Sequence, residues 1–172
     1  MTIFLNRTCF NGLYRVNSSG KFNVPHGRYD KPDIVDEENL RAVRKALKGV
    51  QISVGSYEDN LAMVDDKTFV YFDPPYRPLP NTPSFTDYHK AAFGDAEQAV
   101  LAGMFMELHQ RGAKLMLSNS DPKNTDENDE FFDDMYSDYN IHRVNARRVI
   151  NSDGEGRGEI TEILVINYEV GE

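Results

Sequence analysis

The dipeptide Pro74-Pro75 constrains the fold of this chain most, because neither residue can extend a helix or donate a hydrogen bond to a sheet. The run Thr68-Phe69-Val70-Tyr71-Phe72, which lies just before Asp73 and the prolines, is rich in β-branched and aromatic residues, as expected of a buried strand. The strand should therefore end here, with Asp73-Pro74-Pro75-Tyr76 at the carboxyl edge of a sheet. In open α/β sheets that edge is where ligands bind.

The same four residues also fit a simpler interpretation. Asp-Pro and Pro-Pro are common in loops, where an aspartate often caps a neighbouring turn. The tetrapeptide is therefore a candidate catalytic motif whose meaning depends on the rest of the chain.

Hydrophobic periodicity predicts alternating strands and helices over most of the remaining sequence. The expected strands are residues 50–54, 68–72, 113–118, 141–150 and 159–168, and the expected helices are residues 36–48, a segment carrying Leu61 and Met63, residues 95–111 and residues 122–139. Asp95 and Gln98 suit a capping box, and the Pro-rich segment 77–95 is expected to be a lid. The glycine-rich turn 153–158 would join the last two strands. This order predicts an α/β fold whose mixed sheet ends in a β-hairpin.

The first 30 residues have no helical period and are interrupted by turn signals, which predicts a β-hairpin or an extended ribbon. Arg7 and Arg15 could bind phosphate or guanine, Phe10 could stack on a base and Asn11 could bind a base edge. A surface loop with scattered polar residues is the alternative.

The net charge of −9 argues at first against a nucleic-acid partner. The charge is unevenly distributed, however. Residues 1–31 hold five basic residues and one acidic residue, whereas residues 121–172 hold five basic and fourteen acidic residues. The basic amino-terminal segment can therefore still bind DNA.

Other features exclude several classes of protein. The single Cys9 and four histidines have no metal-ligand spacing, so we expect no metal site and no disulfide framework. No apolar run is long enough to cross a bilayer, and residues 1–7 do not have the layout of a signal peptide. We therefore expect a cytoplasmic protein without a membrane partner.

Taken together, the motifs resemble the Dam-type (D12 class) family of DNA adenine-N6 methyltransferases from about residue 4 to residue 168. The resemblance rests on FLNRTCFNGLYRVNSSGKFNVPHGRY (residues 4–29), on DPPY (73–76), on LSNSD (117–121) and on ARRVIN with RGEITEILVINY (146–151 and 157–168). It implies a Rossmann-like, S-adenosylmethionine-dependent fold. Residues 1–31 would be the hairpin end of a target-recognition domain, and residues 32–172 the carboxyl-terminal part of the catalytic domain.

The resemblance also implies roles for single residues. In the recognition hairpin, Arg15 would bind a guanine and Arg7 would lie near phosphate or base. Leu13 would contact a thymine methyl group. Phe10 and Asn11 would fill the gap left by the target base. Asp73, Pro74, Pro75 and Tyr76 would form the catalytic site, and Ser56, Tyr57 and Asp73 the remaining part of the S-adenosylmethionine site. Double-stranded DNA would be the substrate, with adenine in GATC as the target.

One family feature is missing. Relatives hold S-adenosylmethionine with a Lys-containing segment and a Phe-x-Gly-x-Gly-like loop ahead of the recognition domain, and neither occurs in this sequence. The fold would thus be incomplete, without its amino-terminal cofactor half, and we expect the chain to be inactive alone and to need the missing part as a partner. A non-catalytic DNA-binding remnant, and a methyltransferase acting on an exocyclic amine of RNA or protein, stay open as alternatives.

Overall fold

A computed structural model describes residues 1–79, 93–147 and 159–171. The chain divides into two compact units, Met1–Val54 and Gly55–Glu172, and each is considered by itself. The boundary expected from the sequence, between residues 31 and 32, was placed by proposed function and does not coincide with the boundary between the compact units. It stays a prediction.

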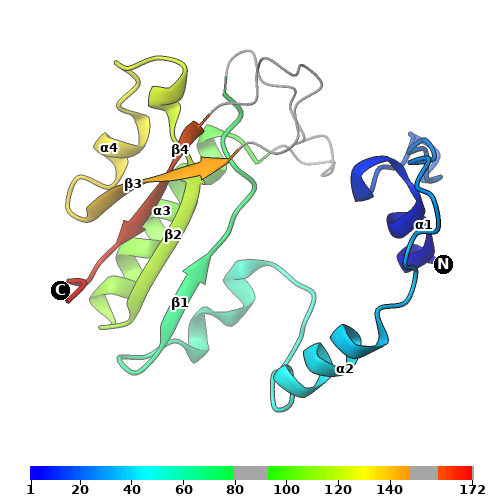
Figure 1. Ribbon diagram of the computed structural model, residues 1–172. Helices are drawn as coiled ribbons and strands as arrows, with labels where there is room; N and C mark the ends of the chain where they lie inside the picture. The colour runs from blue at the N-terminus through cyan, green and yellow to red at the C-terminus, as the bar shows by residue number, and fades with distance from the viewer. Residues whose placement is uncertain (80–92, 148–158, 172) are drawn as a thin grey trace. The chain divides into compact units, whose positions relative to one another are not determined.

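The second unit is built on a four-stranded sheet (Figure 1). Its strands are β1 (Phe69–Phe72), β2 (Lys114–Ser120), β3 (Asn140–Arg147) and β4 (Glu159–Ile166), arranged in the order β1-β2-β4-β3. β1 and β2 are parallel, while β4 is antiparallel to both β2 and β3. The predicted mixed α/β sheet with an antiparallel β3–β4 pair is therefore confirmed. The predicted turn 153–158 and most of the predicted lid lie outside the described residues.

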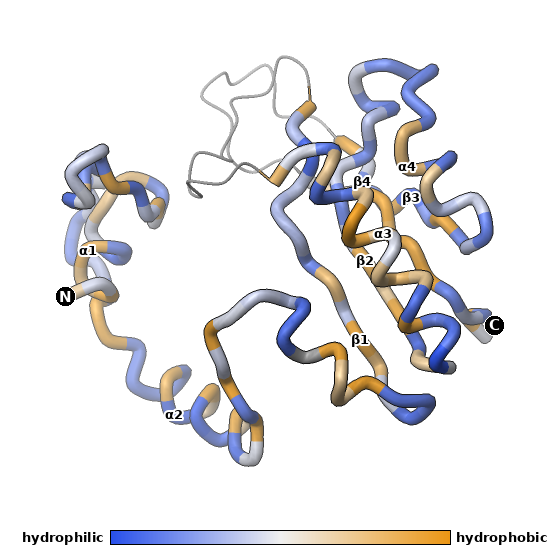
Figure 2. The backbone as a smooth tube through the Cα atoms, turned by 180° about the vertical axis from the view of Figure 1, so that it is seen from behind, coloured by the Kyte–Doolittle hydropathy of each residue, from blue (hydrophilic) through white to orange (hydrophobic). Residues whose placement is uncertain are grey.

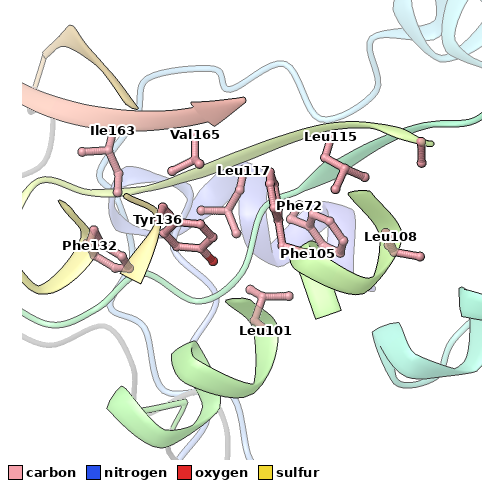
Figure 3. Packing of buried hydrophobic residues seen from close by; sticks show 11 residues of the cluster. Phe72, Leu101, Phe105, Leu108, Leu115, Leu117, Phe132, Tyr136, Ile163 and Val165 are labelled. Carbon is pink, nitrogen blue, oxygen red and sulfur yellow. The ribbon is translucent and has the colours of Figure 1, made fainter. Parts of the chain in front are cut away.

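Helix α3 (Asp95–Gln110) packs on one face of this sheet and contributes three residues to the core. Its residues Leu101, Phe105 and Leu108 point toward Leu115 and Leu117 of β2 (Figure 3). Gly112, with φ of 86°, ends the helix in a left-handed conformation that suits glycine. At the other end Glu97, rather than the expected Gln98, accepts a hydrogen bond from the backbone of Gly94 at 2.8 Å.

Two predicted elements of the second unit are shorter than expected. The segment with Leu61 and Met63 forms a 3₁₀ helix, η2 (Tyr57–Met63). The predicted helix over 122–139 is wrong as one element, since it consists of η4 (Pro122–Asn124) and α4 (Phe131–Met135). Asp121 caps the start of η4, and hydrogen bonds to Asp126 and Asp129 close the polar turns between η4 and α4. These side-chain bonds compete with a continuous helix.

The first unit contains α1 (Thr2–Thr8), η1 (Phe10–Gly12) and α2 (Glu37–Ala46). Helix α1 was not expected from the sequence. An extended ribbon is present around the turn at residues 17–20, with one β-bridge between Val16 and Phe22, but no full hairpin forms. The expected strand at 50–54 is wrong: these residues form no ladder with any described strand, and Val54 is fully exposed.

Candidate active site at the carboxyl edge of β1 and β2

Two sets of polar residues meet at one edge of the sheet because β1 and β2 run in the same direction. Phe72 pairs with Leu117, so Asp73 lies level with Ser118 where β1 ends. Successive strand residues point to opposite faces. Leu115, Leu117 and Asn119 therefore point toward α3, whereas Ser118 points to the other face.

On the face away from α3, a chain of hydrogen bonds ends on Asp73. The hydroxyl of Tyr71 donates to Ser118 Oγ at 2.9 Å, and Ser118 Oγ donates to Asp73 Oδ1 at 3.2 Å. Ser118 is buried, while Asp73 is exposed. One carboxylate oxygen is thus held by the protein, and the other oxygen has no hydrogen bond from the described residues.

On the face toward α3, two buried amides fix the backbone around the prolines. Gln98 Nε2 donates to the carbonyl of Pro75 at 3.1 Å, and Asn119 Nδ2 donates to Gln98 Oε1 at 3.1 Å. Asn119 Oδ1 accepts from the backbone of Arg77 at 2.9 Å. Both amide side chains are fully buried, so these bonds are made without competition from water.

Arg77 ties the end of the tetrapeptide to two other segments. Its guanidinium donates to Asp95 at 2.8 Å and to Asp129 at 2.7 Å, and lies 4.1 Å from the ring centroid of Phe131. The hydrogen bond with Asp95 is the main cause that raises the pKa of Arg77. Burial alone would raise the pKa of Asp129, but the bonds from Arg77 and from the Phe131 backbone outweigh burial and lower it.

Tyr76 is held neutral at this edge. Its hydroxyl donates to Glu162 Oε2 of β4 at 3.2 Å. Burial is the main cause that raises the pKa of Tyr76 to about 12. The negative charges of Glu162 and Asp73 also raise this pKa, whereas a hydrogen bond with Ser118 lowers it. The ring therefore stays uncharged at neutral pH.

The two other predicted cofactor residues open η2. Ser56 caps this helix: its Oγ accepts from the backbone of Glu58 and its own backbone donates to Asp59 at 2.8 Å. Tyr57 packs edge-on against Phe93, with ring centroids 6.5 Å apart. Burial, followed by the charges of Glu58 and Glu97, raises the pKa of Tyr57.

The predicted DNA-binding residues all lie in the first unit. Phe10 and Asn11 belong to η1, both are exposed, and Asn11 has φ of 52°, a left-handed value that asparagine tolerates. Arg15 is held across the ribbon by Asn23, since its Nε donates to the Asn23 side chain at 2.9 Å and its Nη2 to the Asn23 carbonyl at 3.1 Å. Leu13 is half-buried, and Arg7 is exposed in the last turn of α1.

Several residues that hold the tetrapeptide were not predicted from the sequence: Tyr71, Ser118, Gln98, Asn119, Arg77 and Glu162. A signal for Ser118 and Asn119 was present, because LSNSD already marks a polar strand end beside the tetrapeptide. Gln98 and Glu162 lie on distant elements, and nothing in their local sequence points to this edge.

The described residues contain no cluster of histidine, cysteine or carboxylate side chains that could hold a metal ion. No helix within the described ranges is long and apolar enough to cross a membrane.

Comparison with known proteins identifies the family. Residues 1–150 match the family described as D12 class N6 adenine-specific DNA methyltransferase. The type II methyltransferase M.MjaIII of Methanocaldococcus jannaschii is 52% identical over 167 residues, which cover 96% of this chain and 56% of the relative. The type II methyltransferase M1.LlaDCHI of Lactococcus lactis subsp. cremoris is 41% identical, and the match covers 96% of this chain and 57% of the relative. The DNA adenine methylase of Escherichia coli K12 is 38% identical, and the match covers 98% of this chain and 58% of the relative.

The chain thus spans a little more than half the length of the curated relatives that it matches. The family match extends over most of the chain and includes the tetrapeptide. The chain therefore belongs to the D12 class of N6 adenine-specific DNA methyltransferases.

Proposed function

We propose that this chain is the carboxyl-terminal part of a site-specific DNA methyltransferase that transfers a methyl group from S-adenosylmethionine to the N6 amine of adenine in GATC. The observation that carries the proposal is the position of Asp73. Its carboxylate projects from the end of β1 with one oxygen bound by Ser118 and the other open to a substrate. Family membership supplies the reaction class.

The amine needs such a group because the lone pair of an aromatic amine is delocalised into the ring. Asp73 accepts one N6 hydrogen and the carbonyl of Pro74 accepts the other, which localises the lone pair and stabilises the positive charge that develops on nitrogen. Pro75 restricts the backbone of Pro74 and so directs that carbonyl. The N6 proton is lost after transfer, so Asp73 acts as an electrostatic acceptor more than as a strong base.

Tyr76 offers its ring to the adenine, which must leave the duplex to reach this edge. The hydrogen bond from its hydroxyl to Glu162 fixes the orientation of the ring. Gln98 and Asn119 hold the backbone on either side of Tyr76. The acceptors and the stacking ring are thereby positioned before the substrate arrives.

S-adenosylmethionine fits the present residues in part. Tyr57 provides an aromatic surface for an adenine ring, Ser56 lies beside it, and Asp73 would lie near the methionyl end. When bound, the cofactor supplies a methyl group on a positively charged sulfur. Ser56 already caps η2 with its hydroxyl, so its role would be to position Tyr57.

Target recognition would come from the first unit. Arg15, oriented by Asn23, suits the two acceptors of guanine in the major groove. The exposed ring of Phe10 and the side chain of Asn11 suit the gap left by a flipped base. Arg7 and Leu13 would bind phosphate and a thymine methyl group, respectively.

A further segment of the enzyme would complete the catalytic unit, and the isolated chain would be inactive. The sheet face that carries Tyr71 and Ser118 supports this: Phe69 and Tyr71 are 54% and 53% exposed there, and none of the described helices covers them. A full Rossmann-like fold has helices on both faces of its sheet. The missing glycine loop also favours one second candidate, a DNA-binding remnant without catalysis.

Labelled S-adenosylmethionine tests the proposal. The chain would be joined to the amino-terminal part of a relative and offered GATC duplex, GATC-free duplex, RNA and protein. Label on adenine N6 of the GATC duplex alone is expected. Label on RNA or protein would favour another amine substrate, and duplex binding without any labelling would favour the DNA-binding remnant.

A further inference from the structure

Helix α2 carries a basic surface that the recognition residues do not account for. Arg44 and Lys45 lie three and four residues after Arg41 in α2, and Lys48, just past the end of the helix, lies four and three residues after them. The four residues therefore share one side and line a shallow hollow. We call these four residues the α2 basic surface. All four are exposed.

The α2 basic surface has little neutralising charge. Arg41 pairs with Glu37 at 2.6 Å, while Arg44, Lys45 and Lys48 have no ion pair with any residue of the described ranges. Like charges at this spacing destabilise an isolated helix. The helix dipole offsets the repulsion for Arg44 and Lys45 in the last turn, and Glu37 offsets it for Arg41. Lys48, which lies beyond the last residue of the helix, has neither compensation among the described residues.

The first unit, which contains the α2 basic surface, is positively charged, whereas the protein as a whole is negatively charged. The first unit holds nine basic and five acidic residues, whereas the second holds ten basic and twenty-three acidic residues. A polyanion would therefore be attracted to the first unit and repelled by the second.

We propose that the α2 basic surface binds the phosphate backbone of duplex DNA without reading its sequence. This rests on the proposed function, which places DNA on the same unit. Lysine and arginine side chains on an exposed helix suit phosphate groups, which fix position and carry no base information. Hydrophobic and hydrophilic positions alternate along α2 (Figure 2). The apolar residues Leu40, Val43 and Leu47, in and just after the helix, are 45%, 45% and 42% exposed. A membrane surface is therefore the rival partner.

The test is the salt dependence of duplex binding by the 172-residue chain. The triple variant Arg44→Gln, Lys45→Gln, Lys48→Gln is expected to lose about tenfold or more in affinity at low salt. The slope of log affinity against log salt should become shallower by about 2 to 3, since each phosphate contact contributes about 0.9. GATC and GATC-free duplexes should be affected equally.

Two controls make the result specific. The charge-preserving variant Arg44→Lys, Lys45→Arg, Lys48→Arg should bind like the original chain, because phosphate binding here needs charge more than shape. Lys67→Gln with Lys114→Gln removes exposed charge from the second unit and should leave the slope unchanged. Circular dichroism would check that each variant keeps its helices.

An unchanged slope in the triple Gln variant would overturn the proposal, as would α2-dependent binding to anionic phosphatidylserine vesicles in place of duplex. Failure of the proposed function is distinguishable. If Arg15→Ala abolishes a preference for GATC while the triple variant has no effect, the proposed recognition role is supported and DNA binding by the α2 basic surface is refuted. If α2-dependent binding is seen without any preference for GATC, the recognition role is refuted and phosphate binding by the α2 basic surface is supported.

Discussion

At the scale of single residues, Asp73 combines exposure with a fixed orientation. An exposed carboxylate normally rotates freely, but Ser118 Oγ holds one oxygen and is itself held by the Tyr71 hydroxyl. The other oxygen accepts no hydrogen bond from the described residues. We therefore expect Ser118 to be a positioning residue that acts through Asp73.

Replacing Ser118 tests this role. In the completed enzyme, Ser118→Ala should lower the single-turnover methylation rate about tenfold to a hundredfold, as misplaced catalytic groups do, with DNA affinity within twofold. Ser118→Thr keeps the hydroxyl and should restore most of the rate. Equal rates for the Ala and Thr variants would contradict the positioning role.

Tyr76 should make stability depend on alkaline pH. Its folded pKa of about 12 lies above the ordinary value of 10, so its contribution to stability is complete below pH 10 and is lost as pH rises toward 12. The difference in unfolding free energy between the original chain and Tyr76→Phe should therefore fall over this range. Denaturant unfolding at pH 8, 10 and 11.5 measures it, and a constant difference would refute the raised pKa. Taking the difference removes the contribution of the other buried tyrosines.

At this scale, the sequence pointed to the tetrapeptide as a candidate site and missed the residues that hold it in place. Asp73 was evident because prolines and a strand mark its position. Gln98 and Asn119 reach the Pro75 carbonyl and the Arg77 backbone only after α3 packs on β2. Such pairing depends on tertiary structure, which local patterns do not contain.

At the scale of elements, Arg77 connects β1 to the start of α3 and to the segment before α4. Its two ion pairs and its stacking on Phe131 fix the backbone that follows Tyr76. Arg77 is 19% exposed, so these pairs are better protected from water than ordinary surface pairs.

Arg77→Ala should lower the unfolding free energy by about 1–3 kcal/mol, as expected for losing hydrogen bonds between charged groups. Arg77→Lys should recover part of this, since lysine keeps the charge but not the forked geometry. Glu107→Gln, which breaks an exposed pair within α3, is the control and should cost about 0.5 kcal/mol or less. Urea unfolding compares the three, and equal losses for Arg77→Ala and Glu107→Gln would contradict the account.

The elements themselves were predicted to different degrees. β1 and α3 are within a residue or two of their predicted limits, because a proline pair and a glycine mark their ends. Residues 50–54 have strand-like composition, yet a strand needs a neighbour, and none of the described strands pairs with them. Helix α1 has no buried residue and hence no apolar period by which to find it.

At the scale of the whole molecule, the two units carry opposite net charge. The first is basic and carries the proposed recognition residues, and the second is acidic and carries the tetrapeptide. The exposed aromatic face of the sheet is consistent with the proposal that a further segment completes the second unit.

The isolated 172-residue chain should therefore show no methylation and weak or no binding of S-adenosylmethionine. Isothermal calorimetry with the cofactor, in the presence and absence of GATC duplex, measures this directly. Adding the amino-terminal part of a relative should create both binding and activity. Micromolar binding by the isolated chain would show that it holds a complete cofactor site.

The most direct test of the central claim is the Asp73→Ala variant of the completed enzyme, assayed for transfer of labelled methyl to GATC duplex. The account predicts that methylation of adenine N6 is abolished while duplex affinity stays within a few fold, because Asp73 contacts the amine and not the backbone. Turnover at the original rate in this variant would contradict the assignment of Asp73-Pro74-Pro75-Tyr76 as the catalytic site.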